Sequence, residues 1–305
     1  MSCQYGTSHE QKTALITGGG PSGMGLTVAQ ALAVRPDWSV HVVDFNSQRG
    51  EEVANSSERL HFHKADVTDY ASLSAAFQSV FSFDGQNPRL DFVFANAGVI
   101  ESRDFYAAFS QDATPGSDPP PEPDLRSIDV DLKGVILTCY LAQHYFRRSA
   151  HGGKGARLVL TASCGSLYPS YYSPMYTAAK HGVLGFLRSI AKRMQLEGIF
   201  ANAICPGIVE TNLVGEGGWV GFPQDLFTPA DMISKTVLHL VDGKDDLIDA
   251  NGVKVSAEKL YGLSVEINLT NIYIRTPPEF CDEPMRKIME ATDPEQQKGG
   301  VIKDF

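Results

Sequence analysis

The chain has 305 residues, of which 43% are hydrophobic and 20% charged, and its formal net charge is -10. These values are typical of an ordinary soluble globular protein, and this length can bury a substantial core within one α/β domain. The negative charge argues against a nucleic-acid partner or an anionic membrane surface, because both would repel it.

The sequence predicts a cytoplasmic protein. Its first residues lack the basic start and apolar segment of a secretory signal, and no apolar run approaches the roughly 20 residues that span a bilayer. The five cysteines are scattered without CxxC spacing, which indicates reduced thiols. His61 and His63 would share one face of a strand, but no matching ligand cluster accompanies them, so no metal site is predicted.

Short apolar runs alternate with helical patterns along the chain. The first buried strand is predicted at 13–17, and a Gly-rich turn and a helix over about 23–34 follow it. A helix over 69–81 would take Thr68 or Asp69 as its N-cap. Further strands are predicted at 39–44, 60–64, 91–95, 157–162, 200–205 and 263–267, and long helices at about 125–148 and 175–196.

Strands this apolar need cover on both faces, which implies a parallel sheet with right-handed crossovers. The predicted fold is a single Rossmann-type, doubly wound α/β domain over 1–305, with about seven parallel strands and helices on both faces. The Pro-rich segment 114–124 is expected to be a surface loop. The expected parts are a mainly dinucleotide-binding half at 12–150, a catalytic and substrate half at 151–275 with a lid at about 211–228, and a peripheral tail at 276–305.

The turn after the first strand, residues 17–25, reads TGGGPSGMG. Glycines there allow a tight turn and a close approach of the backbone to a pyrophosphate, which would then sit at a helix N-terminus. Asp44 ends the second strand, where a carboxylate can accept hydrogen bonds from the adenosine ribose and would repel a 2′-phosphate. NAD is therefore favoured over NADP. Arg49 is the residue that could reverse this preference.

Tyr176 and Lys180 lie four residues apart, on one face of a predicted helix. A free phenol is a poor base at neutral pH. An ammonium about 4 Å away, at an effective dielectric near 20, would stabilise the phenolate by about 4 kcal/mol. Ser163 closes the fifth predicted strand, at the same edge of the sheet, where its hydroxyl can hydrogen-bond a reacting oxygen. Together the three residues make sense as an acid/base unit.

Along residues 12–270 the chain carries, in this order, Thr17-Gly18, Gly23-Met24-Gly25, Asp66-Val67, Asn96-Ala97-Gly98, Ser163, Tyr176-x-x-x-Lys180 and Pro206-Gly207. This ordered set of motifs resembles the short-chain dehydrogenase/reductase family. The stretches around Tyr176 and Pro206 look most like its hydroxyprostaglandin-dehydrogenase branch, a group of NAD-linked alcohol dehydrogenases.

The resemblance implies a role for each matched residue. Tyr176 would be the general acid/base, Lys180 would favour its phenolate and hold the nicotinamide ribose, and Ser163 would position the substrate oxygen. The other residues expected at the cofactor are Gly18, Ser22, Gly23, Met24, Asp44, Phe45, Asp66, Val67, Asn96, Ala97, Gly98, Pro206, Gly207, Ile208 and Thr211.

Two departures from the family pattern stand out. Four residues separate Gly18 from Gly23, where the family has three, which puts the phosphate contacts in doubt. Asp131 occupies the position at which the family usually has Asn, the residue that completes a proton relay to the lysine. Asp131 would either substitute for this Asn or pair with Lys180 and so weaken the effect of the lysine on Tyr176.

The segment between Thr211 and Thr228 contains several glycines, Trp219 and Phe222, which suggest an apolar lid over the substrate. Tyr168 and Ser173 flank the catalytic residues. A bulky, hydrophobic secondary alcohol or ketone is therefore expected.

Two alternatives to an NAD-dependent alcohol dehydrogenase stay open. One is an NADPH-dependent ketoreductase in a biosynthetic pathway, and the other is a cofactor-binding scaffold with non-redox chemistry.

The two long predicted helices carry apolar residues on more than one side. In the family that the chain resembles, such helices pair across a two-fold axis, so a homodimer or homotetramer is expected.

Overall fold

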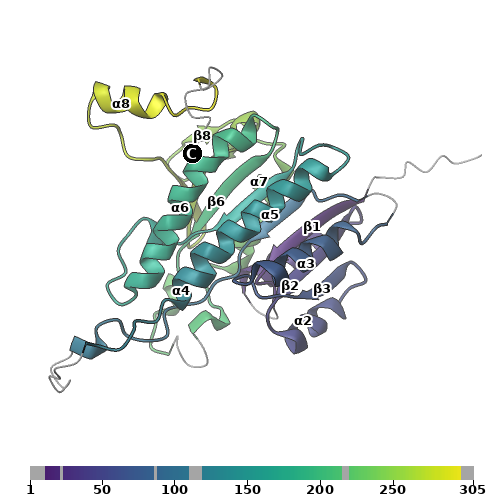
Figure 1. Ribbon diagram of the computed structural model, residues 1–305, viewed down its shortest axis with the longest axis horizontal. Helices are drawn as coiled ribbons and strands as arrows, with labels where there is room; N and C mark the ends of the chain where they lie inside the picture. The colour runs from purple at the N-terminus through teal and green to yellow at the C-terminus, as the bar shows by residue number, and fades with distance from the viewer. Residues whose placement is uncertain (1–10, 21–22, 86–87, 110–118, 215–219, 297–305) are drawn as a thin grey trace, which may run out of the picture.

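The computed structural model describes residues 11–20, 23–85, 88–109, 119–214 and 220–296. An eight-stranded sheet runs through the molecule, and helices cover both of its faces (Figure 1). The strand order reverses beside β1, so the loops after β1 and β4 leave the sheet on either side of a crevice. From edge to edge the strands are β10 (Asn271–Arg275), β9 (Ser264–Asn268), β6 (Phe200–Pro206), β5 (Arg157–Thr161), β4 (Phe92–Ala95), β1 (Lys12–Thr17), β2 (Trp38–Asp44) and β3 (Leu60–Lys64).

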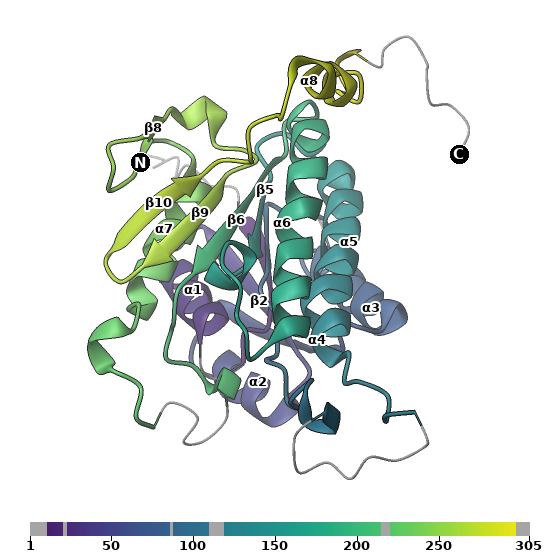
Figure 2. The same cartoon turned by 90° about the vertical axis from the view of Figure 1, so that its left-hand side faces the viewer.

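Helices form a layer on each side of the sheet (Figure 2). One layer contains α3 (Tyr70–Phe81), α5 (Val135–Arg148) and α6 (Pro174–Gln195), and the other contains α1 (Met24–Ala33), α2 (Ser47–Ala54) and α7 (Ala230–Asp242). Successive strand residues belong to opposite cores, as the pleat requires. The smaller elements are η1 (Ala107–Phe109), α4 (Arg126–Ile128), η2 (Asp129–Gly134), η3 (Cys164–Ser166), η4 (Asn212–Val214), η5 (Gln224–Leu226), β7 (Leu247–Ile248), β8 (Lys254–Val255), η6 (Ala257–Lys259) and α8 (Glu283–Glu290).

The predicted doubly wound domain and its seven parallel strands are confirmed: they are β1 to β6 and β9. The eighth strand, β10, pairs antiparallel with β9 and was not predicted. The two strands are joined by Leu269 and Thr270, and Leu269 adopts a φ of 53°. Two-residue hairpins of this kind usually carry Gly or Asn at positive φ. The sequence therefore lacked the usual hairpin signal.

Helix boundaries follow local chemistry. The Asp69 side chain accepts a hydrogen bond from the Ala71 backbone and caps α3, which confirms one of the two predicted N-caps. The helix expected at 125–148 is divided: a π-helical turn, η2, separates α4 from α5. Such turns are rare and often occur at functional sites. Asp131 lies within this one.

The chain beyond β10 adds the short helix α8, which has no buried residue and projects from the body (Figure 1). A hydrogen-bonded ion pair between Lys192 of α6 and Asp293 anchors the segment that follows α8. No helix in the described part of the chain is long and apolar enough to cross a bilayer.

The two histidines of β3 are joined by a third, His41 of β2. The Nδ1 atom of His41 lies 2.9 Å from Nε2 of His63, and its ring lies 4.8 Å from that of His61. Burial lowers the pKa of His41 to about 2, and the two neighbouring imidazoles add to the effect. His41 is therefore uncharged at physiological pH, and it packs edge-on against Phe83.

Candidate active site

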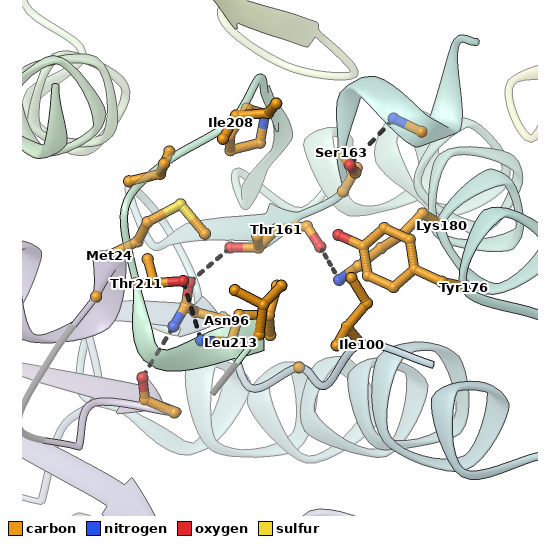
Figure 3. Close-up of a pocket in the computed structure, with 18 of the residues that line it drawn as sticks. Met24, Asn96, Ile100, Thr161, Ser163, Tyr176, Lys180, Ile208, Thr211 and Leu213 are labelled. Carbon is orange, nitrogen blue, oxygen red and sulfur yellow. Dashed lines mark hydrogen bonds between the residues drawn. The ribbon is translucent and has the colours of Figure 1, made fainter. Parts of the chain in front are cut away.

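A cavity of about 490 Å³ opens at the carboxyl ends of the parallel strands (Figure 3). The glycine turn, the ends of β2, β4, β5 and β6, and the start of α6 all contribute to it. Ser163, Tyr176 and Lys180 lie on one side of it, and Met24 and Thr211 lie opposite them in the view of Figure 3. This is the location that parallel α/β sheets use for ligands.

The glycine turn packs too closely for side chains. A Cβ atom on Gly18 would lie 2.6 Å from the Ala97 backbone, and one on Gly20 would lie 2.8 Å from Oδ2 of Asp44. Gly18 and Gly23 also have positive φ values, 67° and 96°, which disfavour other residues. Gly23 is the N-cap of α1 and has no side chain with which to cap it. The amides at the start of α1 therefore have no side-chain acceptor at their N-cap.

Asp44 ties this turn to the second strand. Its Oδ2 accepts a hydrogen bond of 2.9 Å from the Gly20 amide, and its Oδ1 accepts one of 3.0 Å from the Asn46 amide. Asn46 in turn caps α2 by accepting from the Arg49 amide. Asp44 lines the cavity. This end of the cavity thus contains a fixed carboxylate, and Arg49 also lines the cavity.

Asn96 connects three strands beneath the cavity. Its Nδ2 donates to the backbone oxygens of Thr17 and Gly18, and its Oδ1 accepts from the Thr161 hydroxyl (Figure 3). Asn96 is buried, so these bonds are shielded from water. Its side chain holds the glycine turn in position from below, and it takes part in the cavity wall.

Ser163, Tyr176 and Lys180 reach the cavity from two elements. Ser163 begins η3, where its hydroxyl accepts a 3.0 Å hydrogen bond from the Gly165 amide. Tyr176 and Lys180 are one turn apart on α6, and the lysine Nζ lies 5.6 Å from the tyrosine ring centroid. Lys180 is only 2% exposed and donates a 3.0 Å hydrogen bond to the Thr161 backbone oxygen. Its ammonium is therefore held at a fixed distance from the phenol.

Asp131 is fully buried beside this group. Its Oδ1 accepts a 2.7 Å hydrogen bond from the Val99 amide, and its Oδ2 has no hydrogen-bond partner among the described residues. A Cβ atom on Gly98 would lie 2.9 Å from that Oδ1 and 3.5 Å from Nζ of Lys180, so only glycine fits between them. Burial raises the pKa of Asp131 to about 6, although the Lys180 ammonium opposes the shift.

Comparison with known proteins decides the family. Residues 12–217 match the family model described as short chain dehydrogenase. The chain belongs to the short-chain dehydrogenase/reductase family. It is therefore an oxidoreductase that acts on CH–OH or ketone groups.

Two curated relatives illustrate the similarity of this chain to known family members. The short-chain dehydrogenase/reductase prx7 of Penicillium rubens is 53% identical over 283 residues, which cover 92% of this chain and 99% of that protein. Human 15-hydroxyprostaglandin dehydrogenase (NAD+) is 29% identical over 211 residues, which cover 67% of this chain and 70% of that protein.

A solved structure supports the fold. The 3-ketoacyl-(acyl-carrier-protein) reductase from Brucella melitensis complexed with NADH superimposes with a TM-score of 0.67 at 22% identity. The match covers 86% of this chain and 98% of that one.

The cavity of this short-chain dehydrogenase brings together most of the residues singled out in the sequence. The predicted residues that line it are Gly18, Gly23, Met24, Asp44, Asn96, Gly98, Ser163, Ser173, Tyr176, Lys180, Pro206, Gly207, Ile208 and Thr211. Ser22 and Trp219 lie outside the described residues. Phe45, Asp66, Val67 and Ala97 do not line it; Phe45 and Ala97 each lie between two lining residues in the chain, whereas Asp66 and Val67 follow β3 and have no lining residue near them in sequence.

Two expected substrate contacts have other partners. The Tyr168 hydroxyl donates to Glu266 at 3.2 Å and accepts from Arg275, so this ring binds the β9–β10 hairpin and does not line the cavity. Phe222 packs edge-on against Phe227 at 5.6 Å and does not line it either. Both aromatic residues were predicted to line the pocket from their positions in the sequence. Hydrogen bonds and ring packing to residues distant from the catalytic set direct their side chains elsewhere.

Several lining residues were not singled out from the sequence. Thr161 hydrogen-bonds to both Asn96 and Lys180. It is the last residue of β5, and this position at the carboxyl end of a parallel strand could have indicated a site residue. Cys164 directly follows Ser163. Ile100, Leu213 and Val214 make part of the wall apolar. These positions carry no motif, because an apolar wall requires only apolar residues of suitable size.

Asp131→Asn should raise the free energy of unfolding at pH 8 by about 3 kcal/mol. The pKa of the Asp131 carboxyl is about 6 in the folded protein and 3.8 in the unfolded chain, so at pH 8 its ionisation destabilises the folded state, and an amide does not ionise. The cost of the buried carboxylate is absent below pH 3.8, grows between 3.8 and 6, and is constant above 6. Denaturant titrations should therefore show the gain falling to roughly half at pH 5.

Activity provides the second readout for this substitution. We expect kcat to be unchanged or higher, since the amide keeps an acceptor for the Val99 amide and removes a negative charge near Lys180. Asp129→Asn, at an exposed position of the same turn, is the control and should change stability by less than about 0.5 kcal/mol. A large loss of kcat in Asp131→Asn would contradict the view that this aspartate is a tolerated variant.

Proposed function

We propose that this short-chain dehydrogenase transfers a hydride between NAD(H) and a secondary alcohol or ketone, with Ser163, Tyr176 and Lys180 as its catalytic set. The observation that carries the proposal is the position of these three side chains in the cavity that also contains the glycine turn and Asp44. The reaction balances as alcohol and NAD+ giving ketone, NADH and one proton. The nicotinamide supplies the hydride chemistry when it is bound.

The residues present fit a dinucleotide. The glycine turn leaves no room for a Cβ atom at Gly18 or Gly20, and it leads into the start of α1, which has no side-chain cap. A pyrophosphate is the kind of anion that a free helix N-terminus binds. Asp44 would accept from the ribose hydroxyls at the far end of the cavity. Lys180 would reach the second ribose near Tyr176.

The proton steps are assigned to this chain's own side chains. In the oxidising direction, the Tyr176 phenolate takes the proton from the substrate hydroxyl; in the reducing direction, the phenol returns it to the carbonyl oxygen. The Ser163 hydroxyl donates a hydrogen bond to the same oxygen, and the Gly165 amide fixes its direction. The Lys180 ammonium, held by Thr161, favours the charged form of the phenol.

A hydrophobic substrate is proposed from the wall of the cavity. Ile100, Ile208, Leu213 and Val214 line the cavity. Burial of an apolar substrate against such side chains is favourable, whereas a sugar would leave hydroxyl groups without partners. We therefore propose a bulky, apolar secondary alcohol or ketone, with Ser173 as one further hydroxyl available to it.

One observation favours a second candidate, an NADPH-dependent ketoreductase. Arg49 lines the same end of the cavity as Asp44, and a guanidinium can bind a 2′-phosphate. Fluorescence titrations with NADH and with NADPH separate the two candidates. The NAD proposal expects NADH to bind more tightly, and tighter binding of NADPH would replace it with the second candidate.

Asp44→Ala should weaken NADH binding by about 10- to 10²-fold, because it removes charge-assisted hydrogen bonds to the ribose. It should also reduce the preference of the protein for NADH over NADPH. Fluorescence titration measures both constants. Arg49→Ala is the matched control, and it should leave NADH affinity within about 3-fold of the wild type. If Asp44→Ala leaves the ratio of the two affinities unchanged, then Asp44 does not select the cofactor.

A further inference from the structure

The N-terminus of α6 lacks the cap that its own sequence would supply. Ser173 is the N-cap residue, yet its side chain makes no capping hydrogen bond. Pro174 follows at the first helical position and has no N–H group. The next two residues, Met175 and Tyr176, carry the amides that an N-cap side chain normally accepts from.

A carboxylate from a distant part of the chain accepts from both amides. The Oε2 atom of Glu101 lies 2.9 Å from the Met175 nitrogen and 3.3 Å from the Tyr176 nitrogen. Glu101 is separated from them by 74 and 75 residues in sequence and is half-buried. Its negative charge also lies at the positive end of the helix dipole, where it is favoured.

Glu101 belongs to a segment that contacts several parts of the site. Asn96 at its start holds the glycine turn, the Val99 amide binds Asp131, and Ile100 lines the cavity. Glu101 is the next residue and binds the helix that carries Tyr176 and Lys180. The segment 96–101 thus connects the cofactor side of the cavity to the catalytic helix.

We propose that Glu101 is a positioning residue that caps α6 from outside the helix and thereby fixes Tyr176 relative to Ser163. The inference rests on the proposed function only for its catalytic consequence. A tyrosine in the first turn of a helix moves with that turn, and a catalytic group displaced by a fraction of an ångström loses rate steeply. Fixing the first turn of α6 therefore fixes the phenol.

The test compares three variants with the wild type, once wild-type turnover has been found on a panel of alcohols and ketones. Glu101→Ala should lower kcat by about 10- to 10²-fold and leave the KM for NADH within about 3-fold, since Glu101 does not line the cavity. Glu101→Gln keeps an acceptor oxygen and should restore most of kcat. Asp104→Ala removes a carboxylate that, among the described residues, accepts a hydrogen bond only from the Tyr106 amide in the same loop, and it should match the wild type.

Hydrogen exchange of the protein without cofactor provides a readout that does not depend on activity. The amides at Met175 and Tyr176 should exchange faster in Glu101→Ala and at the wild-type rate in Asp104→Ala. Unchanged exchange at the start of α6 would overturn the capping role. A wild-type kcat in Glu101→Ala would overturn the positioning role. Absence of turnover in the wild type would instead count against the proposed function, which the exchange measurement does not touch.

Discussion

Tyr176→Phe is expected to lower kcat/KM by about 10²- to 10⁴-fold, which is the usual contribution of a positioned general acid or base. The substitution removes one oxygen atom from a side chain in the cavity wall and keeps the ring in place. Without the hydroxyl, no described side chain at that point can take the substrate proton. Binding of NADH should change little, because the ring still fills its position.

The measurement is the rate of NADH formation from an alcohol that the wild type oxidises, followed by the near-ultraviolet absorbance of the reduced cofactor. Tyr172→Phe is the matched control: this residue lies in the same segment, is 93% exposed and does not line the cavity, so its loss of a hydroxyl should have no effect. Full turnover in Tyr176→Phe would remove the basis of the mechanism.

Lys180→Met is expected to lower kcat/KM by about 10²-fold at neutral pH. The substitution removes the ammonium that lies 5.6 Å from the Tyr176 ring centroid and leaves an uncharged side chain of similar length in its place. A fixed cation at this position stabilises negative charge that develops beside it in the reaction, so its loss should slow the proton transfer.

The pH profile distinguishes electrostatic from steric damage in this variant. If the lysine acts through its charge, part of the lost rate should return as the pH is raised, because hydroxide then produces the phenolate unaided. Lys192→Met, at a half-buried position on the same helix, removes ion pairs to Asp293 and Glu295 that lie outside the cavity, and it should retain activity. A pH-independent loss in Lys180→Met would show that the charge is not the cause.

Local sequence patterns predicted the fold well because both of its layers follow from hydrophobic periodicity. Most strands of the parallel sheet are buried on both faces and read as nearly unbroken apolar runs, as in LVLT of β5. Right-handed crossovers then decide which face of the sheet each connecting helix covers. The strand β10 was not predicted, because Leu269 adopts the positive φ at a hairpin position where glycine or asparagine is usual.

Site residues were predictable where the chemistry requires a particular residue type. Glycines at Gly18 and Gly23 are needed for the turn, and a phenol and an ammonium one helical turn apart are needed for the proton transfer. Glu101 could not be predicted in this way, because its two partners are 74 and 75 residues away and any nearby acceptor would do. Tyr168 was assigned to the substrate from its position in the chain, whereas its hydroxyl binds Glu266.

The central claim, hydride transfer at this cavity, is tested most directly by isotope transfer. NADH carrying deuterium in place of both hydrogens on C4 of the nicotinamide is incubated with the wild type and a panel of apolar ketones, and the products are analysed by mass spectrometry. We expect an alcohol with one deuterium on the carbinol carbon, and no such product from Tyr176→Phe within the same time. Bound NADH with no deuterium in any product, across the whole panel, would contradict it.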